Sequence, residues 1–273
     1  MNARLAGLLV NGALLAIAAF ALFPLLWMLS VSFMQPSEAS AFPPPLLPAH
    51  ATFANYRELF VRAGMGRYLF NSLIVASAIT GLSLFCNLAA GYAFAKLRFR
   101  GRDRLFQSLL VALLIPAQVA MIPLFLIMKA LHLVNSYGGV VVPALASMFG
   151  IYLVRQYARS IPQELIEAAR IDGAGELRIF ATIVLPLLKP IVATLAIFTF
   201  LSSWNDFMWP LIVLSDEAWQ TAPVALASLS REHVQDNELM MAGSVVTTLP
   251  VLALFLVLQR HYIQGLLLGS VKG

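Results

Sequence analysis

The carboxylate of Asp206 is the first group in this chain that is placed where it could do chemistry. It is the only acid in the apolar stretch 191–214, and it follows Trp204 and Asn205. A charge inside a bilayer is costly and usually functional, so these three residues are candidates for the path of a polar solute. Two other roles stay open for Asp206: it could lie in an outer vestibule, or cap a local helix break before Pro210. Tryptophans also gather at membrane interfaces.

A second group of polar residues lies in the stretch 155–189. Ser160, Pro162 and Gln163 form a good helix start, with Ser160 as the cap, proline in the first turn and Gln163 reaching back. We expect a helix to follow through Ile171. The stretch therefore predicts a stiff helix rather than a plain connector.

The end of this predicted helix is marked by Asp172 and Gly173, because glycine accommodates the left-handed turn that closes helices. A second helix should start near Ala174 and run toward residues 185–186. The small side chains of Ala168 and Ala169 would let another surface approach the backbone closely. The flanking Glu167 and Arg170 could pair with each other or with a partner.

Several chemistries are excluded by what the sequence lacks. A phosphate-binding loop needs a Gly-Lys-Ser/Thr sequence, and no Gly-Lys pair occurs in the chain. The histidines (His50, His132, His233 and His261) are far apart in sequence, and Cys86 is the only cysteine. We therefore expect no catalytic residues, no metal site and no nucleotide site in this chain.

The elements that must hold these residues are apolar. The 273 residues are 60% hydrophobic and only 11% charged, whereas a soluble domain carries about 25% charged residues. Runs long enough to cross a bilayer occur at 5–33, 68–95, 105–128, 137–154, 191–214 and 241–258. Prolines inside the last four of these runs would kink their helices. The sequence therefore predicts an all-α polytopic membrane protein with six transmembrane helices.

The positions of lysine and arginine predict the orientation. With the N-terminus inside, the inner segments hold thirteen basic residues (Arg4, Lys96, Arg98, Arg100, Arg102, Arg104, Arg155, Arg159, Arg170, Arg178, Lys189, Arg260 and Lys272), and the outer ones hold five (Arg57, Arg62, Arg67, Lys129 and Arg231). The positive-inside rule then places both termini in the cytoplasm. The cluster 96–104 could also be a lipid or nucleic-acid patch, but topology is the preferred explanation.

The predicted organisation is a single transmembrane domain, 1–273, because no internal repeat or low-complexity linker divides the chain. The polar and acidic outer segment 215–239 is a plausible docking surface for a soluble partner outside. An ordinary solvated connector explains this segment equally well.

The stretch Glu167-Ala168-Ala169-x-x-Asp172-Gly173-Ala174, continued by Phe180, Ile183, Leu185-Pro186 and Pro190, resembles the EAA loop of binding-protein-dependent ATP-binding-cassette (ABC) importers. Further segments resemble the MalG-like carbohydrate branch of that family: Thr52-x-x-Asn55-Tyr56, the stretch 204–211, Gln259-Arg260 and the tail 269–273. The tail has Ser270 where alanine is expected. The resemblance extends along nearly the whole chain.

The resemblance implies a type I importer permease fold in the bacterial inner membrane, with a cytoplasmic coupling loop at about 157–189. Glu167 would contact a basic residue of a separate ATPase, Ala168 and Ala169 would permit close packing, and Gly173 would form the turn beside Asp172. The partners implied are a second permease, two ATP-binding subunits that hold ATP and magnesium, and an extracytoplasmic solute-binding protein. The cargo would be a carbohydrate or related polyol.

The alternatives to an importer permease are an ion-coupled secondary transporter and a membrane enzyme. An ion-coupled secondary transporter of a small polar solute usually needs several intramembrane ionisable groups, and Asp206 alone is available. A membrane enzyme needs clustered reactive side chains, which the sequence lacks. Both classes are less consistent with the sequence than an importer permease.

Overall fold

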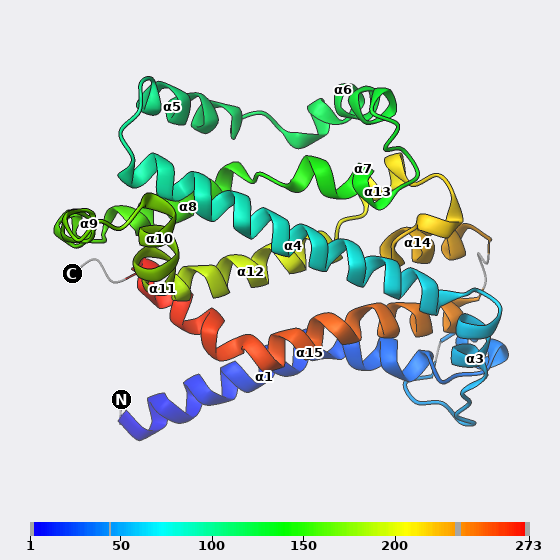
Figure 1. Cartoon of the computed structure of the whole chain (residues 1–273). Helices are drawn as coiled ribbons and strands as arrows, with labels where there is room; N and C mark the ends of the chain where they lie inside the picture. Colours follow the sequence, from blue (N-terminus) through cyan, green and yellow to red (C-terminus); the bar gives the residue numbers. More distant parts are fainter. Residues whose placement is uncertain (1–2, 44, 233–235, 271–273) are drawn as a thin grey trace. The chain divides into compact units, whose positions relative to one another are not determined.

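The computed structural model describes residues 3–43, 45–232 and 236–270, and helix is the only regular secondary structure in them. The longer helices are α1 (Ala3–Val31), α4 (Met65–Lys96), α5 (Arg102–Ala112), α6 (Ala117–Ala130), α8 (Met148–Arg159), α12 (Lys189–Trp204), α14 (Ala222–Glu232) and α15 (Asn237–Ser270) (Figure 1). The shorter ones are α2 (Pro36–Ala39), α3 (Ala54–Val61), α7 (Tyr137–Val141), α9 (Gln163–Ile171), α10 (Glu176–Ile179), α11 (Leu185–Leu187) and α13 (Met208–Val213). The predicted all-α class is confirmed.

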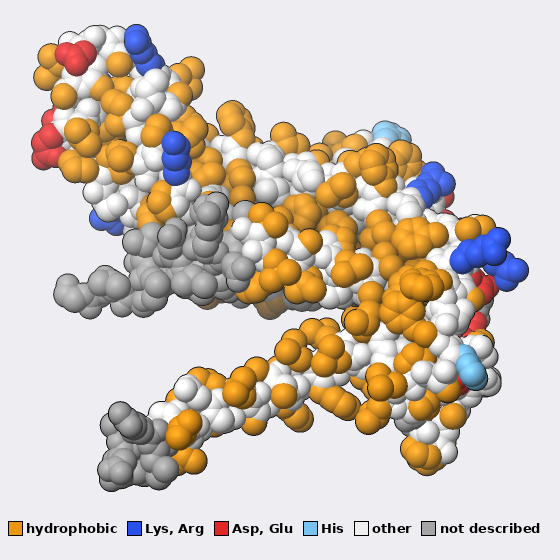
Figure 2. All heavy atoms as spheres, turned by 90° about the horizontal axis from the view of Figure 1, so that it is seen from below, with side chains coloured by type: hydrophobic (Ala, Val, Ile, Leu, Met, Phe, Trp, Pro, Cys, Tyr) orange, Lys and Arg blue, Asp and Glu red, His pale blue; other side chains and the backbone are white. Residues whose placement is uncertain are grey.

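Four helical segments are long and apolar enough to cross a membrane: Gly7–Val31, Met65–Lys96, Tyr137–Arg159 and Asn237–Val257. Two helix pairs also pass this test but are sharply bent: α5 with α6, by 106°, and Glu176–Leu187 with α12, by 80°. The described residues thus hold four spans, or up to six if each bent pair is one span. Hydrophobic side chains cover the length of the helices seen in Figure 2, and charged side chains gather near the helix ends.

The third and fifth predicted spans are not continuous helices. Between α5 and α6 the helix stops after Ala112, and Pro116 takes the position before the first turn of α6. Proline has no N–H to donate and disfavours helical geometry in the residue before it. In the fifth span, α12 ends at Trp204 and α13 begins at Met208. At Pro116 the expected kink is therefore a full break, and in the fifth span the break lies before Pro210, which is inside α13.

The chain forms two compact units, which are described separately. The first comprises the described residues up to 69 together with 222–250, and the second comprises 70–221 with 251–270. In the first unit, a buried cluster around Leu59, Met65 and Ala242 joins α3, the start of α4, α14 and α15. Asn55 supports it by donating from Nδ2 to the carbonyls of Ser32 and Met34, both at 2.9 Å.

The second unit has two buried clusters. One surrounds Val154 and Ile179 and packs α8, α9 and α10 against α4 and α12. The other surrounds Val75, Met128 and Val213 and joins α4 with α6, α7 and α13. These clusters hold both candidate sites, because the stretches 160–188 and 199–209 pack on them.

Helices α4 and α8 approach each other unusually closely at Gly91. A Cβ atom placed there would lie 2.5 Å from Cγ1 of Val154 and 3.0 Å from the backbone nitrogen of Arg155. One helical turn away, Gly150 faces the side chain of Asn87 in the same way. Small residues allow helix backbones this close approach in membranes, so the crossing depends on the glycines.

The outer segment 215–239 is partly helical. Asp216 and Glu217 are exposed around a short 3-10 turn, Glu217–Trp219, which fits a docking surface. Glu238 does not fit it, because only 3% of the residue is exposed. The apolar packing of α15 beside it covers this acid. Residues 233–235, like 271–273 of the tail, lie outside the described residues.

Candidate coupling surface and translocation cavity

Helix α9 lies on the second unit with one buried face and one open face. Ile166 is fully buried among Ile161, Ile179 and Val154. Glu167 and Ala168, the next two residues, are exposed. Neighbouring residues on a helix point in directions about 100° apart, so a single apolar anchor leaves the adjacent positions free. The helix is thus held from beneath and presents the Glu-Ala pair outward.

The C-terminus of α9 closes with a Schellman motif, as the sequence predicted. The Ala174 N–H donates to the Ala169 carbonyl (2.9 Å) and the Gly173 N–H donates to the Arg170 carbonyl (3.0 Å). Gly173 has a φ of +81°, in the left-handed region that favours glycine. The turn is fixed by backbone hydrogen bonds and re-aims the chain into α10.

The predicted cap at the start of α9 is wrong. The helix begins at Gln163 with Pro162 in the capping position, and no side chain caps it. Ser160 instead donates from Oγ to the Tyr157 carbonyl (2.7 Å), at the C-terminal end of α8. Only three residues separate the two helices, so the serine binds the carbonyl behind it rather than the amides ahead.

A polar bridge closes the corner between α9 and α10. Arg170 donates from Nε to one carboxylate oxygen of Glu176 (2.7 Å), and the Tyr92 hydroxyl on α4 donates to the other (2.8 Å). This hydrogen bond raises the pKa of the Arg170 guanidinium further above its ordinary value. Arg170 therefore pairs with Glu176 and not with Glu167. The exposed Glu167 carboxylate forms no ion pair within the described residues.

Two large apolar side chains flank the Gly173 turn in full view of solvent. Ile171 and Leu177 are each 86% exposed. Isolated exposed apolar residues are common, but two beside a rigid turn at the end of a docked helix are typical of a contact surface. Ile171 and Leu177, with Glu167 and Ala168, form what we call the coupling surface.

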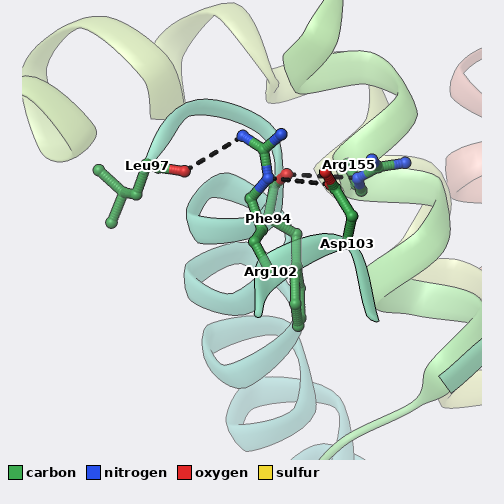
Figure 3. Close-up of polar contacts among 5 residues, drawn as sticks. All are labelled: Phe94, Leu97, Arg102, Asp103 and Arg155. Atoms are coloured by element: carbon green, nitrogen blue, oxygen red, sulfur yellow. Dashed lines mark hydrogen bonds and ion pairs between the residues drawn. The ribbon is translucent and has the colours of Figure 1, made fainter. Parts of the chain in front are cut away.

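The base of α9 is tied to the C-terminal end of α4. The buried ammonium of Lys96 donates to the Ile161 carbonyl (2.5 Å). Nearby, Arg155 donates from Nε to the Phe94 carbonyl (3.3 Å; Figure 3). Its guanidinium also lies 3.8 Å above the Phe106 ring. Sequence reasoning missed these contacts, because their partners are 65 and 61 residues apart.

A cavity of about 590 Å³ lies within the second unit, between α4, α6, α7, α8, α12 and α13. One part of its lining is polar: Ser83, Ser147, Thr199, Ser202, Ser203 and Asp206. The rest is apolar and includes Met121, Phe149 and Phe198. The Ser203 hydroxyl is buried and has no hydrogen-bond partner within the described residues. A cavity of this size with both kinds of lining suits a small polar organic solute.

The three predicted pathway residues lie differently with respect to this cavity. Asp206 is part of its lining, at the break between α12 and α13, where the backbone amides of Met208 and Trp209 face its carboxyl group. Trp204 is buried, with its ring stacked on Phe200. Asn205 donates to the Leu201 carbonyl (2.8 Å) at the end of α12. The serine and threonine lining carried no recognisable spacing in the sequence.

The chain is similar to known transport proteins along almost its whole length. The profile of the family "Binding-protein-dependent transport system inner membrane component" matches residues 87–267. The arabinooligosaccharides transport system permease protein AraQ of Halalkalibacterium halodurans is 40% identical over 260 residues, 94% of this chain and 93% of the relative. The lactose transport system permease protein LacG of Rhizobium radiobacter is 32% identical over 265 residues, 97% and 96% of the two chains.

A solved structure gives the same result for the fold. It is the crystal structure of a bacterial ABC transporter involved in the import of the acidic polysaccharide alginate, matched with a TM-score of 0.83 and 27% identity. The match covers 95% of this chain and 97% of that one. These likenesses support an ABC importer and give no support to ion-coupled transport.

Proposed function

The chain belongs to the binding-protein-dependent transport system inner membrane components, the permeases of ABC importers, and we propose that it brings an oligosaccharide or related polyol into the cytoplasm. As a multi-pass inner-membrane protein it forms part of the channel through which the solute moves. The relatives named for arabinooligosaccharides, lactose and alginate support this cargo class. Their differing cargoes leave the particular sugar to experiment.

The proposed topology has six spans with both termini in the cytoplasm. Of the two bent pairs, α5 with α6 then counts as one interrupted span, and in the pair of Glu176–Leu187 with α12 the span is carried by α12. Helix α13 continues this span after the break that follows Trp204. The thirteen-to-five distribution of basic residues supports this orientation. It places α9, α10 and the loop 97–101 on the cytoplasmic side, and the segment 215–239 outside, where a solute-binding protein would dock on Asp216 and Glu217.

The coupling surface would transmit the movement of the ATPase. ATP and magnesium would bind to two partner subunits, because this chain has no phosphate-binding loop. The open face of α9 would sit in a groove of one ATPase, with Glu167 meeting a basic residue and Ala168 and Ala169 allowing close approach. Two observations carry this proposal: Ile166 is buried beneath the exposed Glu167 and Ala168, and the Gly173 turn fixes the C-terminal end of α9. A helix that is fixed at its base and at its end moves as one body.

The cavity around Asp206 would be this subunit's share of the translocation path. Its hydroxyl-bearing lining suits the hydroxyl groups of a sugar, and the Phe149 and Phe198 rings suit the apolar face of a sugar ring. A second, homologous permease would complete the path. Trp204 would support the helix break from behind, and Asn205 would close the end of α12.

The test is capture of the tagged chain from native membranes, followed by identification of the co-purifying subunits and measurement of ATPase activity. We expect a second permease and an ATPase, with activity stimulated by the binding protein. Glu167→Lys should release the ATPase and abolish uptake while the chain still inserts. Glu217→Lys, the same reversal on the outer side, should keep the ATPase bound. Equal ATPase recovery with both variants would refute the coupling assignment.

A further inference from the structure

Three arginines in the segment 98–104, which follows α4, have no side-chain partner within the described residues. Arg98, Arg100 and Arg104 are exposed, and their side chains form no hydrogen bond or ion pair with any residue that the structure describes. They are concentrated in seven residues where Asp103 is the only acid. Like charges held this close repel one another, so the cluster is suited to an anionic ligand.

The neighbouring basic residues are used differently. Arg102 donates to the Leu97 carbonyl (3.3 Å) and to Asp103 (3.1 Å), and Arg155 donates to the Phe94 carbonyl (Figure 3). The Arg155 guanidinium also lies over the Phe106 ring. These contacts fix the shape of the loop and neutralise Asp103. Arg102 and Arg155 therefore have structural roles. Arg98, Arg100 and Arg104 remain available to bind a ligand.

The loop borders an open hollow of about 500 Å³, which is lined by Arg98, Phe99, Gly101, Arg102, Asp103 and Arg104. Gly101, with a φ of +82°, turns the chain back here. The Asp103 carboxylate is paired with Arg102 at 3.1 Å, so the lining keeps a net positive charge. Phe99 is 41% exposed at its rim. This volume is large enough for a phosphodiester with a small polar head, and guanidinium groups bind phosphate through paired, charge-assisted hydrogen bonds.

Exposed apolar surface follows the hollow along α5. Leu105 is 55% exposed and Val111 is 62% exposed, on different sides of this helix, whereas Phe106 is buried against the core. The exposed apolar surface therefore begins one residue after Arg104. Such a juxtaposition of a cationic hollow with exposed apolar helix surface matches the two halves of an anionic phospholipid.

We propose that the hollow binds the phosphate headgroup of an anionic phospholipid, whose acyl chains lie along the exposed apolar surface of α5. The proposed orientation of the chain places this lipid in the cytoplasmic leaflet. The binding itself does not depend on that orientation. Because Lys96 ties this loop to Ile161 at the base of α9, the bound lipid also braces the coupling helix.

The experiment is native mass spectrometry of the intact importer complex, purified in detergent and incubated with phosphatidylglycerol or phosphatidylcholine. We expect the wild type to retain phosphatidylglycerol preferentially. Arg98→Gln/Arg100→Gln/Arg104→Gln should lose most of this preference, at about fivefold in affinity per arginine. Arg57→Gln/Arg62→Gln/Arg67→Gln removes the same charge from the first unit and should leave the preference unchanged.

Two further arms make the result decisive. The lysine triple variant, Arg98→Lys/Arg100→Lys/Arg104→Lys, should retain most of the preference even if the glutamine variant fails to assemble. Soluble glycerophosphoglycerol should compete only weakly, because it lacks acyl chains. The site would be overturned if Arg98→Gln/Arg100→Gln/Arg104→Gln assembled and kept its full preference for phosphatidylglycerol. It would also be overturned if the control, Arg57→Gln/Arg62→Gln/Arg67→Gln, lost this preference to the same extent. Equal binding of glycerophosphoglycerol would assign the hollow to a free phosphate ligand.

Discussion

Arg170 and Glu176 face each other across the Gly173 turn, with Nε of the arginine 2.7 Å from a carboxylate oxygen of the glutamate. The pair joins the last turn of α9 to the first turn of α10. The second carboxylate oxygen of Glu176 accepts a hydrogen bond from the Tyr92 hydroxyl, which lies on the membrane-spanning helix α4. One carboxylate thus holds α9, α10 and the membrane-spanning helix α4 at a single point.

Neutralising either member of this pair should loosen the corner to a similar extent. Arg170→Gln and Glu176→Gln should each lower uptake, and the double variant should be no worse than either, because one broken contact already opens the bridge. Both side chains are partly exposed, so we expect a coupling energy of only about 0.5–1 kcal/mol in thermal unfolding of the complex. Arg178→Gln, an exposed neighbour on α10, is the control. Additive losses would show that the two residues act separately.

Gly173→Ala should uncouple transport, whereas Gly175→Ala should not. A Cβ atom meets nothing within 4 Å at either position. The difference is backbone geometry: Gly173 has a φ of +81° and Gly175 one of −71°. Left-handed geometry costs about 1–2 kcal/mol for a residue with a side chain. The measurement is solute transported per ATP hydrolysed in proteoliposomes.

Asparagine tolerates left-handed geometry better than alanine, so Gly173→Asn should recover part of the activity lost in Gly173→Ala. Identical coupling ratios in Gly173→Ala, Gly175→Ala and wild type would show that the Schellman turn does not matter for coupling.

Gly91→Ala should destabilise the α4–α8 crossing by about 1–3 kcal/mol, because the added methyl group would press on Val154 and the helix backbone. Gly81→Ala on the same helix is the matched control, since a Cβ atom there meets nothing within 4 Å. The measurement is the melting temperature of the detergent-solubilised complex. If Gly81→Ala lowered it as much as Gly91→Ala, helix propensity or lipid contact would be responsible, not the crossing.

Asp206→Asn and Asp206→Ala should separate two roles of this residue. Asparagine caps a helix about as well as aspartate, so Asp206→Asn keeps the break before α13 and removes only the charge. We expect it to raise the KM for uptake about fivefold, since a hydrogen bond to a charged group is about 1 kcal/mol stronger than a neutral one. Asp206→Ala should also lower the yield of folded complex. An unchanged KM in Asp206→Asn would reduce Asp206 to a cap.

Local chemistry made some features predictable. The end of α9 followed from Gly173, because a left-handed turn depends mainly on one residue. The span boundaries at Val31 and Lys96 followed from the length of apolar sequence. The prediction for Ser160 was wrong because α8 ends and α9 begins only three residues apart. A serine between them can hydrogen-bond to either helix end. The complete break at Pro116 was underestimated, since a proline within an apolar run is compatible with both a kink and a stop.

Other features depend on parts of the chain that are distant in sequence. The Tyr92–Glu176 hydrogen bond joins residues 84 positions apart, and no spacing rule connects them. The cavity lining comes from six helices (α4, α6, α7, α8, α12 and α13), and its serines are ordinary residues of membrane helices until packing brings them together. A single sequence therefore predicted the coupling segment better than the cavity.

The contact between Lys96 and Ile161 also has a consequence for biosynthesis. The ribosome adds about 5–20 residues per second, so the carbonyl that receives this ammonium is made roughly 3–13 s after the lysine. During that interval α4 enters the membrane, but the Lys96 ammonium at its C-terminal end has no native hydrogen-bond acceptor. The amine can stay hydrated at the bilayer surface until α8 arrives and draws it inward. The C-terminal end of α4 thus reaches its native position only after Ile161 has been made. The same contact positions α9, which follows Ile161.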